Sequence, residues 1–169
     1  MEGIILSGGL YMKNNLKALL LHFIILVFSI IFLIIFVASG PKIGPYIDNI
    51  ICRLFLGTAF LLVYIFSGTL LDINTSKRYD FFSGCFIAII GIALWIYAFS
   101  ITGRNLLEIP EELSEYWILH NIYQTPFIFI DLIFGLPNIP LLSLITNLFP
   151  SVLLGLGLKY KRFKSVKAD

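Results

Sequence analysis

Long apolar runs separated by short polar segments dominate the chain. Three of them, residues 18–38, 50–71 and 81–101, contain few polar positions, and a helix of about 20 apolar residues crosses the hydrocarbon core of a bilayer. A fourth run, 141–158, contains Pro150, which predicts a kink. The pattern therefore predicts an all-α protein with four transmembrane helices in a single membrane domain, residues 1–169.

A mixed segment, residues 109–136, separates the third run from the fourth. Pro110 followed by Glu111 and Glu112 is typical of a helix start. One face of this helix would be apolar and rich in aromatic residues, which favours a position on the membrane surface: Ile109, Leu113, Tyr116 and Trp117. Residues 127–136 are too short to cross, so we expect an interfacial or re-entrant segment on the outer side.

The alternative is five transmembrane helices, with residues 117–136 as an additional span. It would bring His120, Asn121, Gln124 and Asp131 into the bilayer, and an aspartate alone costs about 2.5–3.5 kcal/mol at a helix centre. Four spans with both termini cytoplasmic place nine of the twelve basic residues inside, as the positive-inside rule requires. Five spans place eight inside, so charge alone separates the two topologies weakly.

The amino-acid composition indicates that lipid, and not water, surrounds most of the chain. The 169 residues are 59% hydrophobic and only 13% charged, whereas soluble domains carry about 25% charged residues. We therefore expect an integral membrane protein with the lipid bilayer as its main partner. The basic tail, residues 159–169, is typical of a cytoplasmic end that faces anionic lipid. Because the membrane accounts for these charges, we expect no nucleic-acid binding.

The N-terminus predicts a second possible start of translation. From Met12 the chain has the form of a bacterial membrane protein, a short basic segment that runs into a hydrophobic helix. Residues 1–11 are then a leader that is not part of the native protein, and a native Met1 or Glu2 peptide in mass spectrometry would contradict this. The expected location is a bacterial-type plasma membrane. Cys52 and Cys85 are predicted to lie near opposite faces, unbridged and buried.

Asp131 is the first candidate site residue, since an ionisable group in an apolar segment marks a functional site by default. It could bind an ion or a basic ligand. The competing interpretation, which we favour, is that Asp131 caps a short helix or forms a charge pair with Arg53 or Arg104, both assigned to the same outer side.

Two further groups of residues are better explained by contacts between helices than by ligand binding. Asn147, Ser151 and Thr146 on the last helix could line a polar path, although such residues more often hydrogen-bond between helices. On the third helix, small residues recur at spacings of three and four, which predicts close helix packing: Gly84, Ala88, Gly91 and Ala98.

Catalytic motifs are absent from the sequence. Glu112 and His120 lie eight residues apart, about two turns on one helix face, but no metal-ligand spacing accompanies them, so we expect no metal, no cofactor and no enzymatic activity. The leading hypothesis is a non-enzymatic accessory, regulatory or immunity-type subunit that acts through other membrane subunits or as a homo-oligomer. The alternatives are a small oligomeric carrier that uses Asp131, and an enzyme on a lipid-linked substrate that uses Glu112, His120 and Asp131.

Overall fold

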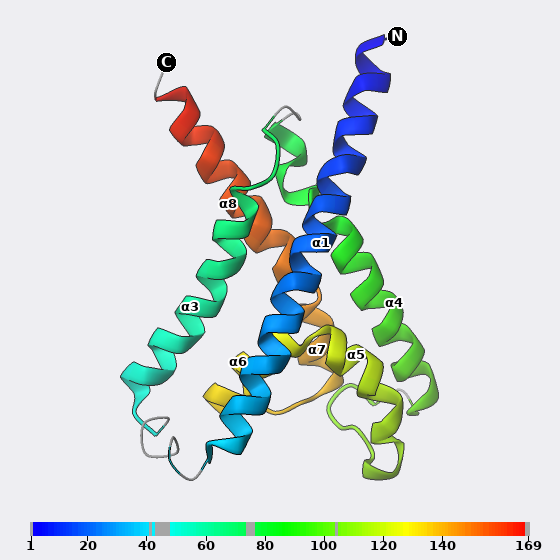
Figure 1. Cartoon of the computed structure of the whole chain (residues 1–169). Helices are drawn as coiled ribbons and strands as arrows, with labels where there is room; N and C mark the ends of the chain where they lie inside the picture. The colour runs from blue at the N-terminus through cyan, green and yellow to red at the C-terminus, as the bar shows by residue number, and fades with distance from the viewer. Residues whose placement is uncertain (1, 41, 43–47, 74–76, 104, 168–169) are drawn as a thin grey trace.

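Helices make up every regular element in the part of the chain that the computed structural model describes, residues 2–40, 42, 48–73, 77–103 and 105–167. The all-α prediction is confirmed. The N-terminal end of α1 (Glu2–Ala38) and the C-terminal end of α8 (Phe149–Val166) lie at the same end of the bundle (Figure 1). We call this the terminal end; α1 reaches the opposite end at Ala38, where α3 (Ile50–Gly68) begins.

Three helical stretches are long and apolar enough to cross a membrane: Tyr11–Ala38 in α1, Ile50–Gly68, which is α3, and Pro140–Val166. This agrees with a membrane protein. The third predicted span is α4 (Cys85–Ile101), which is apolar but has 17 residues, at the short limit of the roughly 17–25 that spanning helices use.

The start of α4 is set by contacts with distant segments. Residues 77–82 form a 3-10 helix, η1 (Lys77–Phe82), and not the first turn of α4, because the Phe81 carbonyl accepts a hydrogen bond from the Ser151 hydroxyl of α8 at 2.8 Å. The Asn15 side chain of α1 then accepts a hydrogen bond from the Phe86 N–H at 3.3 Å, which satisfies one of the free donors of a helix N-terminus.

The segment that the five-span alternative would use does not form one long helix. It consists of the 3-10 helix η2 (Glu111–Trp117), then α5 (Ile118–Tyr123) and α6 (Thr125–Phe134). Gln124 separates α5 from α6, with Pro126 in the first turn of α6, and Gly135 ends α6 at φ 65°. The expected surface position of Trp117 is not observed, since this side chain is fully buried and packs edge-on against Trp95 of α4.

The last apolar run is broken and not merely kinked. α7 (Pro140–Thr146) ends one residue before Asn147, and α8 begins at Phe149. A proline ring clashes with the carbonyl four residues earlier, and for Pro150 that carbonyl belongs to Thr146, the last residue of α7. α8 then continues to Val166, so most of the predicted tail is helical.

Packing joins these pieces through glycines and aromatic rings. α8 crosses α3 where Gly68 and Gly157 leave no room for a side chain. Phe129 of α6 is fully buried between α1 and α3, with its ring 5.0 Å from that of Phe32 and 4.7 Å from that of Phe60. α6 is thereby held inside the bundle. Cys52 and Cys85 are free and partly buried, not fully buried as expected.

Candidate functional site

The predicted charge pairs of Asp131 do not form within the described residues. Asp131 lies on α6, half-buried, without an ion pair, while Arg53 lies 3.6 Å from Asp48, whose side chain is 85% exposed. Arg104 lies outside the described residues. Asp131 therefore remains a candidate ligand residue.

The three predicted path residues face different ways. Thr146 donates its hydroxyl to the Ser143 carbonyl one turn earlier, at 3.0 Å, and Ser151 bonds Phe81 of η1. Asn147 accepts a hydrogen bond at Oδ1 from Nε2 of Gln124. All three side chains are buried, but each has a different hydrogen-bond partner, and a polar path along them stays a prediction.

Two helix breaks meet at this hydrogen bond. Gln124 lies between α5 and α6, and Asn147 lies between α7 and α8. Discontinuous helices form many binding sites of membrane transporters, because the backbone and side chains at the breaks are free to bind a solute. Irregular backbone at membrane depth is tolerated only inside protein or beside a wet cavity, and both residues are fully buried.

Gly91 of α4 allows the two breaks to meet. A Cβ at this position would collide with Oδ1 of Asn147 and would lie 3.1 Å from Nε2 of Gln124. All four small residues predicted for packing, Gly84, Ala88, Gly91 and Ala98, are buried. At Gly91 the missing side chain leaves room for polar atoms and not for another helix backbone.

Aromatic and imidazole groups extend this region toward α1 and α3. His22 of α1 bonds the Tyr64 hydroxyl through Nδ1 at 2.9 Å, and its ring lies 4.7 Å from that of Tyr123. Tyr123 donates to the Ile87 carbonyl, one turn before Gly91, at 2.9 Å. His120 lies against the side chains of Asn121 and Asn147. We define the polar cluster as these seven residues: His22, Tyr64, His120, Asn121, Tyr123, Gln124 and Asn147.

Several buried polar atoms of the polar cluster make no well-formed hydrogen bond. In the described part of the chain there are six such side-chain atoms, and all six belong to the cluster: His22 Nε2, His120 Nδ1 and Nε2, Asn121 Oδ1, Gln124 Oε1 and Asn147 Nδ2. Because His120 interacts with the side chains of Asn121 and Asn147, some of these atoms can also pair with one another. A buried polar group without a hydrogen bond costs about 1–3 kcal/mol. Their concentration in one place favours a site that hydrogen-bonds something other than the protein itself.

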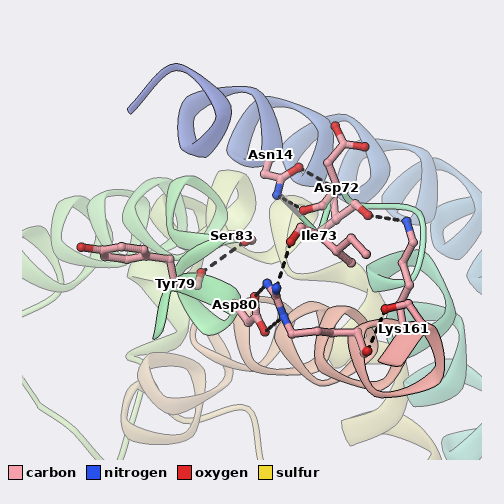
Figure 2. Close-up of polar contacts among 10 residues, drawn as sticks. Asn14, Asp72, Ile73, Tyr79, Asp80, Ser83 and Lys161 are labelled. Atoms are coloured by element: carbon pink, nitrogen blue, oxygen red, sulfur yellow. Dashed lines mark hydrogen bonds and ion pairs between the residues drawn. The ribbon is translucent and has the colours of Figure 1, made fainter. Parts of the chain in front are cut away.

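The polar cluster contains no charged carboxylate, ammonium or guanidinium group, and a separate network of charged and polar residues lies at the terminal end. There Asn14 of α1 makes two bonds to the backbone of Asp72, donating to its carbonyl at 2.9 Å and accepting from its N–H at 3.0 Å. Lys161 of α8 donates to the Leu71 carbonyl at 2.7 Å. Figure 2 shows how these side chains from α1 and α8 converge on the segment around Asp72. Part of the basic tail therefore holds this segment in place.

Asp80 and Arg162 form the strongest pair of this end. Nη2 of Arg162 lies 2.6 Å from Oδ1 of Asp80, and Nε lies 3.1 Å from Oδ2. The Asp80 side chain is only 3% exposed. Nη1 of Arg162 also donates to the Ile73 carbonyl at 2.9 Å. This two-pronged contact positions η1 against α8.

The catalytic and metal-binding arrangement considered from the sequence is not assembled. Glu112 is exposed on η2, whereas His120 is buried on α5 with its ring 5.6 Å from that of Trp117. Within the described residues, no three histidine, cysteine, aspartate or glutamate side chains lie close enough to hold a metal ion. The polar cluster, by contrast, brings together the side-chain donors and acceptors of amides, imidazoles and phenols.

Sequence reasoning identified only part of the cluster. Asn147 and His120 were considered as candidate site residues. Asn121 and Gln124 were treated as reasons to keep their segment out of the bilayer, and Tyr64 and Tyr123 were not singled out. Polar side chains on both sides of a helix break are the signal that indicates them.

Comparison with known proteins gives no further guide: no protein-family model, no curated protein and no solved structure matches the chain.

Proposed function

We propose that this protein is a four-span carrier with both termini in the cytoplasm, which binds a small uncharged polar solute at the polar cluster. The observation that carries the proposal is the group of six buried polar atoms without a well-formed hydrogen bond, at and around the point where two broken helices meet. The four spans would be α1, α3, α4 and the α7–α8 pair, while α5 and α6 would enter the bundle without crossing.

The chemistry of the cluster defines the solute class. Its members are amides, imidazoles and phenols, and none is a carboxylate, an ammonium or a guanidinium. A charged solute would find no opposite charge there, and an unpaired buried charge is far more costly than an unpaired neutral group. A solute with a donor and an acceptor side by side, such as an amide or a diol, matches the free atoms of Gln124 and Asn147.

The hydrogen bond between Gln124 and Asn147 would act as the exchangeable contact. A solute that bonds both side chains replaces one protein–protein bond with two protein–solute bonds. The break at Gln124 would let α6 move relative to α5, and the break at Asn147 would let α7 move relative to α8 within the fourth span. This division between rigid spans and movable short helices is common in transporters.

Flux of urea and glycerol into proteoliposomes tests the proposal. We expect swelling faster than in protein-free vesicles, and the Gln124→Leu, Asn147→Leu double variant should lose about fivefold to tenfold of this flux, since a neutral hydrogen bond contributes about 1 kcal/mol. Asn138→Leu, the same replacement at an exposed loop position, is the matched control. No protein-dependent flux of either solute would overturn the proposal.

Stability of the same double variant separates a solute site from structural hydrogen bonding. Replacing both partners of a buried bond with apolar groups is often neutral or stabilising. We therefore expect an unchanged or higher melting temperature together with the reduced flux. A lower melting temperature with unchanged flux would mean that the cluster only holds the helices together.

The accessory-subunit function predicted from the sequence remains the competing proposal. It predicts that the chain binds another membrane subunit, which crosslinking in mild detergent would detect, and that purified protein alone moves no solute. The lipid-enzyme hypothesis has less in its favour, because Glu112 and His120 lie in different environments.

A further inference from the structure

An apolar groove runs between α1 and α3 on the outside of the bundle. Its volume is about 460 Å³. Leu21, Ile25, Phe28 and Phe32 contribute from α1, and Phe60 and Val63 from α3. The hydroxyl of Ser29, also in the lining, is already donated to the Ile25 carbonyl at 2.8 Å. The groove therefore has few groups that could hydrogen-bond water.

The dimensions of the groove match one acyl chain. Leu21 and Phe32 are eleven residues apart, or about 16 Å along a helix, and one leaflet of a hydrocarbon core about 30 Å thick is about 15 Å deep. Phe32 and Phe60 meet edge to face with their centroids 5.7 Å apart, which closes the far end.

Positive charge lies directly above the open end. Lys17 and Lys13 precede Leu21 by four and eight residues, so all three share one face of α1. Lys13 lies 3.4 Å and Lys17 3.7 Å from the carboxylate of Asp72, and the Lys13 side chain is 67% exposed. Lys161 adds a third positive charge near the same carboxylate. Burial raises the pKa of Asp72, but Lys17 and Lys13 outweigh it, so the pKa lies below its ordinary value.

We propose that this site binds one anionic phospholipid from the leaflet at the terminal end, with an acyl chain in the groove and the phosphate at Lys13 and Lys17. Three cations around one carboxylate leave the region net positive, and anionic headgroups are attracted to such clusters. The site is separate from the polar cluster, and it needs only that α1 and α3 lie in a bilayer.

Native mass spectrometry of the full chain tests the proposal. The protein is purified in detergent with equal amounts of phosphatidylglycerol and phosphatidylcholine of identical chains but distinct isotopic mass. We expect one retained lipid, with phosphatidylglycerol preferred. Lys13→Gln, Lys17→Gln should reduce that preference about 25-fold, since each lysine contributes roughly fivefold to anionic-lipid attraction. Lys164→Gln, Lys167→Gln, exposed at the same end, should leave it unchanged.

Two further variants probe the two halves of the site. Asp72→Asn removes the competing carboxylate and should strengthen the preference for phosphatidylglycerol, the opposite of the lysine variants. Ala59→Trp fills the groove and should release both lipids, whereas Ala93→Trp, at an exposed position on α4, should not. Equal retention of the two lipids by the unmodified protein, or a preference that Lys13→Gln, Lys17→Gln leaves intact, would overturn the proposal in favour of unselective boundary lipid.

Discussion

Gly157→Ala is expected to lower the melting temperature by about 6–12 °C, which corresponds to about 3 kcal/mol for a chain of this size. A Cβ on Gly157 would collide with the Ile65 carbonyl oxygen and would lie 2.9 Å from the Cα of Gly68. These are backbone atoms of α3, so no side chain can rotate away. The helices themselves must separate.

Gly68 lies on the α3 side of the same contact. A Cβ on Gly68 would collide with the Leu154 carbonyl oxygen and would lie 2.9 Å from the Leu154 Cα, so Gly68→Ala should have a comparable effect. Close glycine contacts are a common way for membrane helices to pack. Gly40→Ala is the matched control, because nothing lies within 4 Å of a Cβ there. Thermal unfolding in detergent measures all three, and a Gly157→Ala variant as stable as Gly40→Ala would contradict the α3–α8 packing.

Arg162→Ala is expected to destabilise the fold by about 3–5 kcal/mol, because it leaves a buried carboxylate without its counter-charge. The Asp80 side chain is 3% exposed, while that of Arg162 is 15% exposed. Asp80→Ala should cost less, since the longer arginine side chain can turn its charge toward the headgroups. The two halves of one ion pair are thus expected to have unequal effects.

The double variant distinguishes loss of the pair from other damage. Asp80→Ala, Arg162→Ala removes the stranded carboxylate and should be more stable than Arg162→Ala alone. Arg162→Lys should not restore stability, because a lysine cannot reproduce the two-pronged contact. Asp48→Ala, which removes an exposed partner of Arg53, is the control and should cost no more than about 1 kcal/mol. Equal stability of Arg162→Ala and Asp48→Ala in denaturant unfolding would be evidence against a buried pair.

The lengths of the apolar runs were the sequence feature that predicted helix positions most reliably. The first residue of α3, Ile50, and the last of α4, Ile101, are those predicted, because polar or turn-forming residues end the apolar runs there. The start of α4 was placed four residues early, because the bond from Ser151 to the Phe81 carbonyl holds residues 77–82 in a 3-10 helix. That bond joins residues seventy positions apart, which no local pattern contains.

The polar cluster shows the same limit. His120 was considered with Glu112, and Asn147 with Ser151, because helical spacing relates residues that are near in sequence. Their actual neighbours are set by two helix breaks that bring Gln124 to Asn147 beside Gly91. The cost of polar residues in a bilayer led the sequence argument to place residues 120–124 outside it. In the structure these residues are shielded inside the bundle.

Labelling of single cysteines in intact cells measures directly whether residues 118–134 fold into the bundle without crossing the bilayer. The cysteines are introduced one at a time at Lys13, Asn138 and Lys167 in a Cys52→Ser, Cys85→Ser background, and a membrane-impermeant maleimide is added. We expect labelling at Asn138 and, at Lys13 and Lys167, labelling only after permeabilisation. Labelling of Lys13 and Lys167 from opposite faces of the membrane would mean an odd number of crossings. The contact between the two helix breaks at Gln124 and Asn147 would then be wrong.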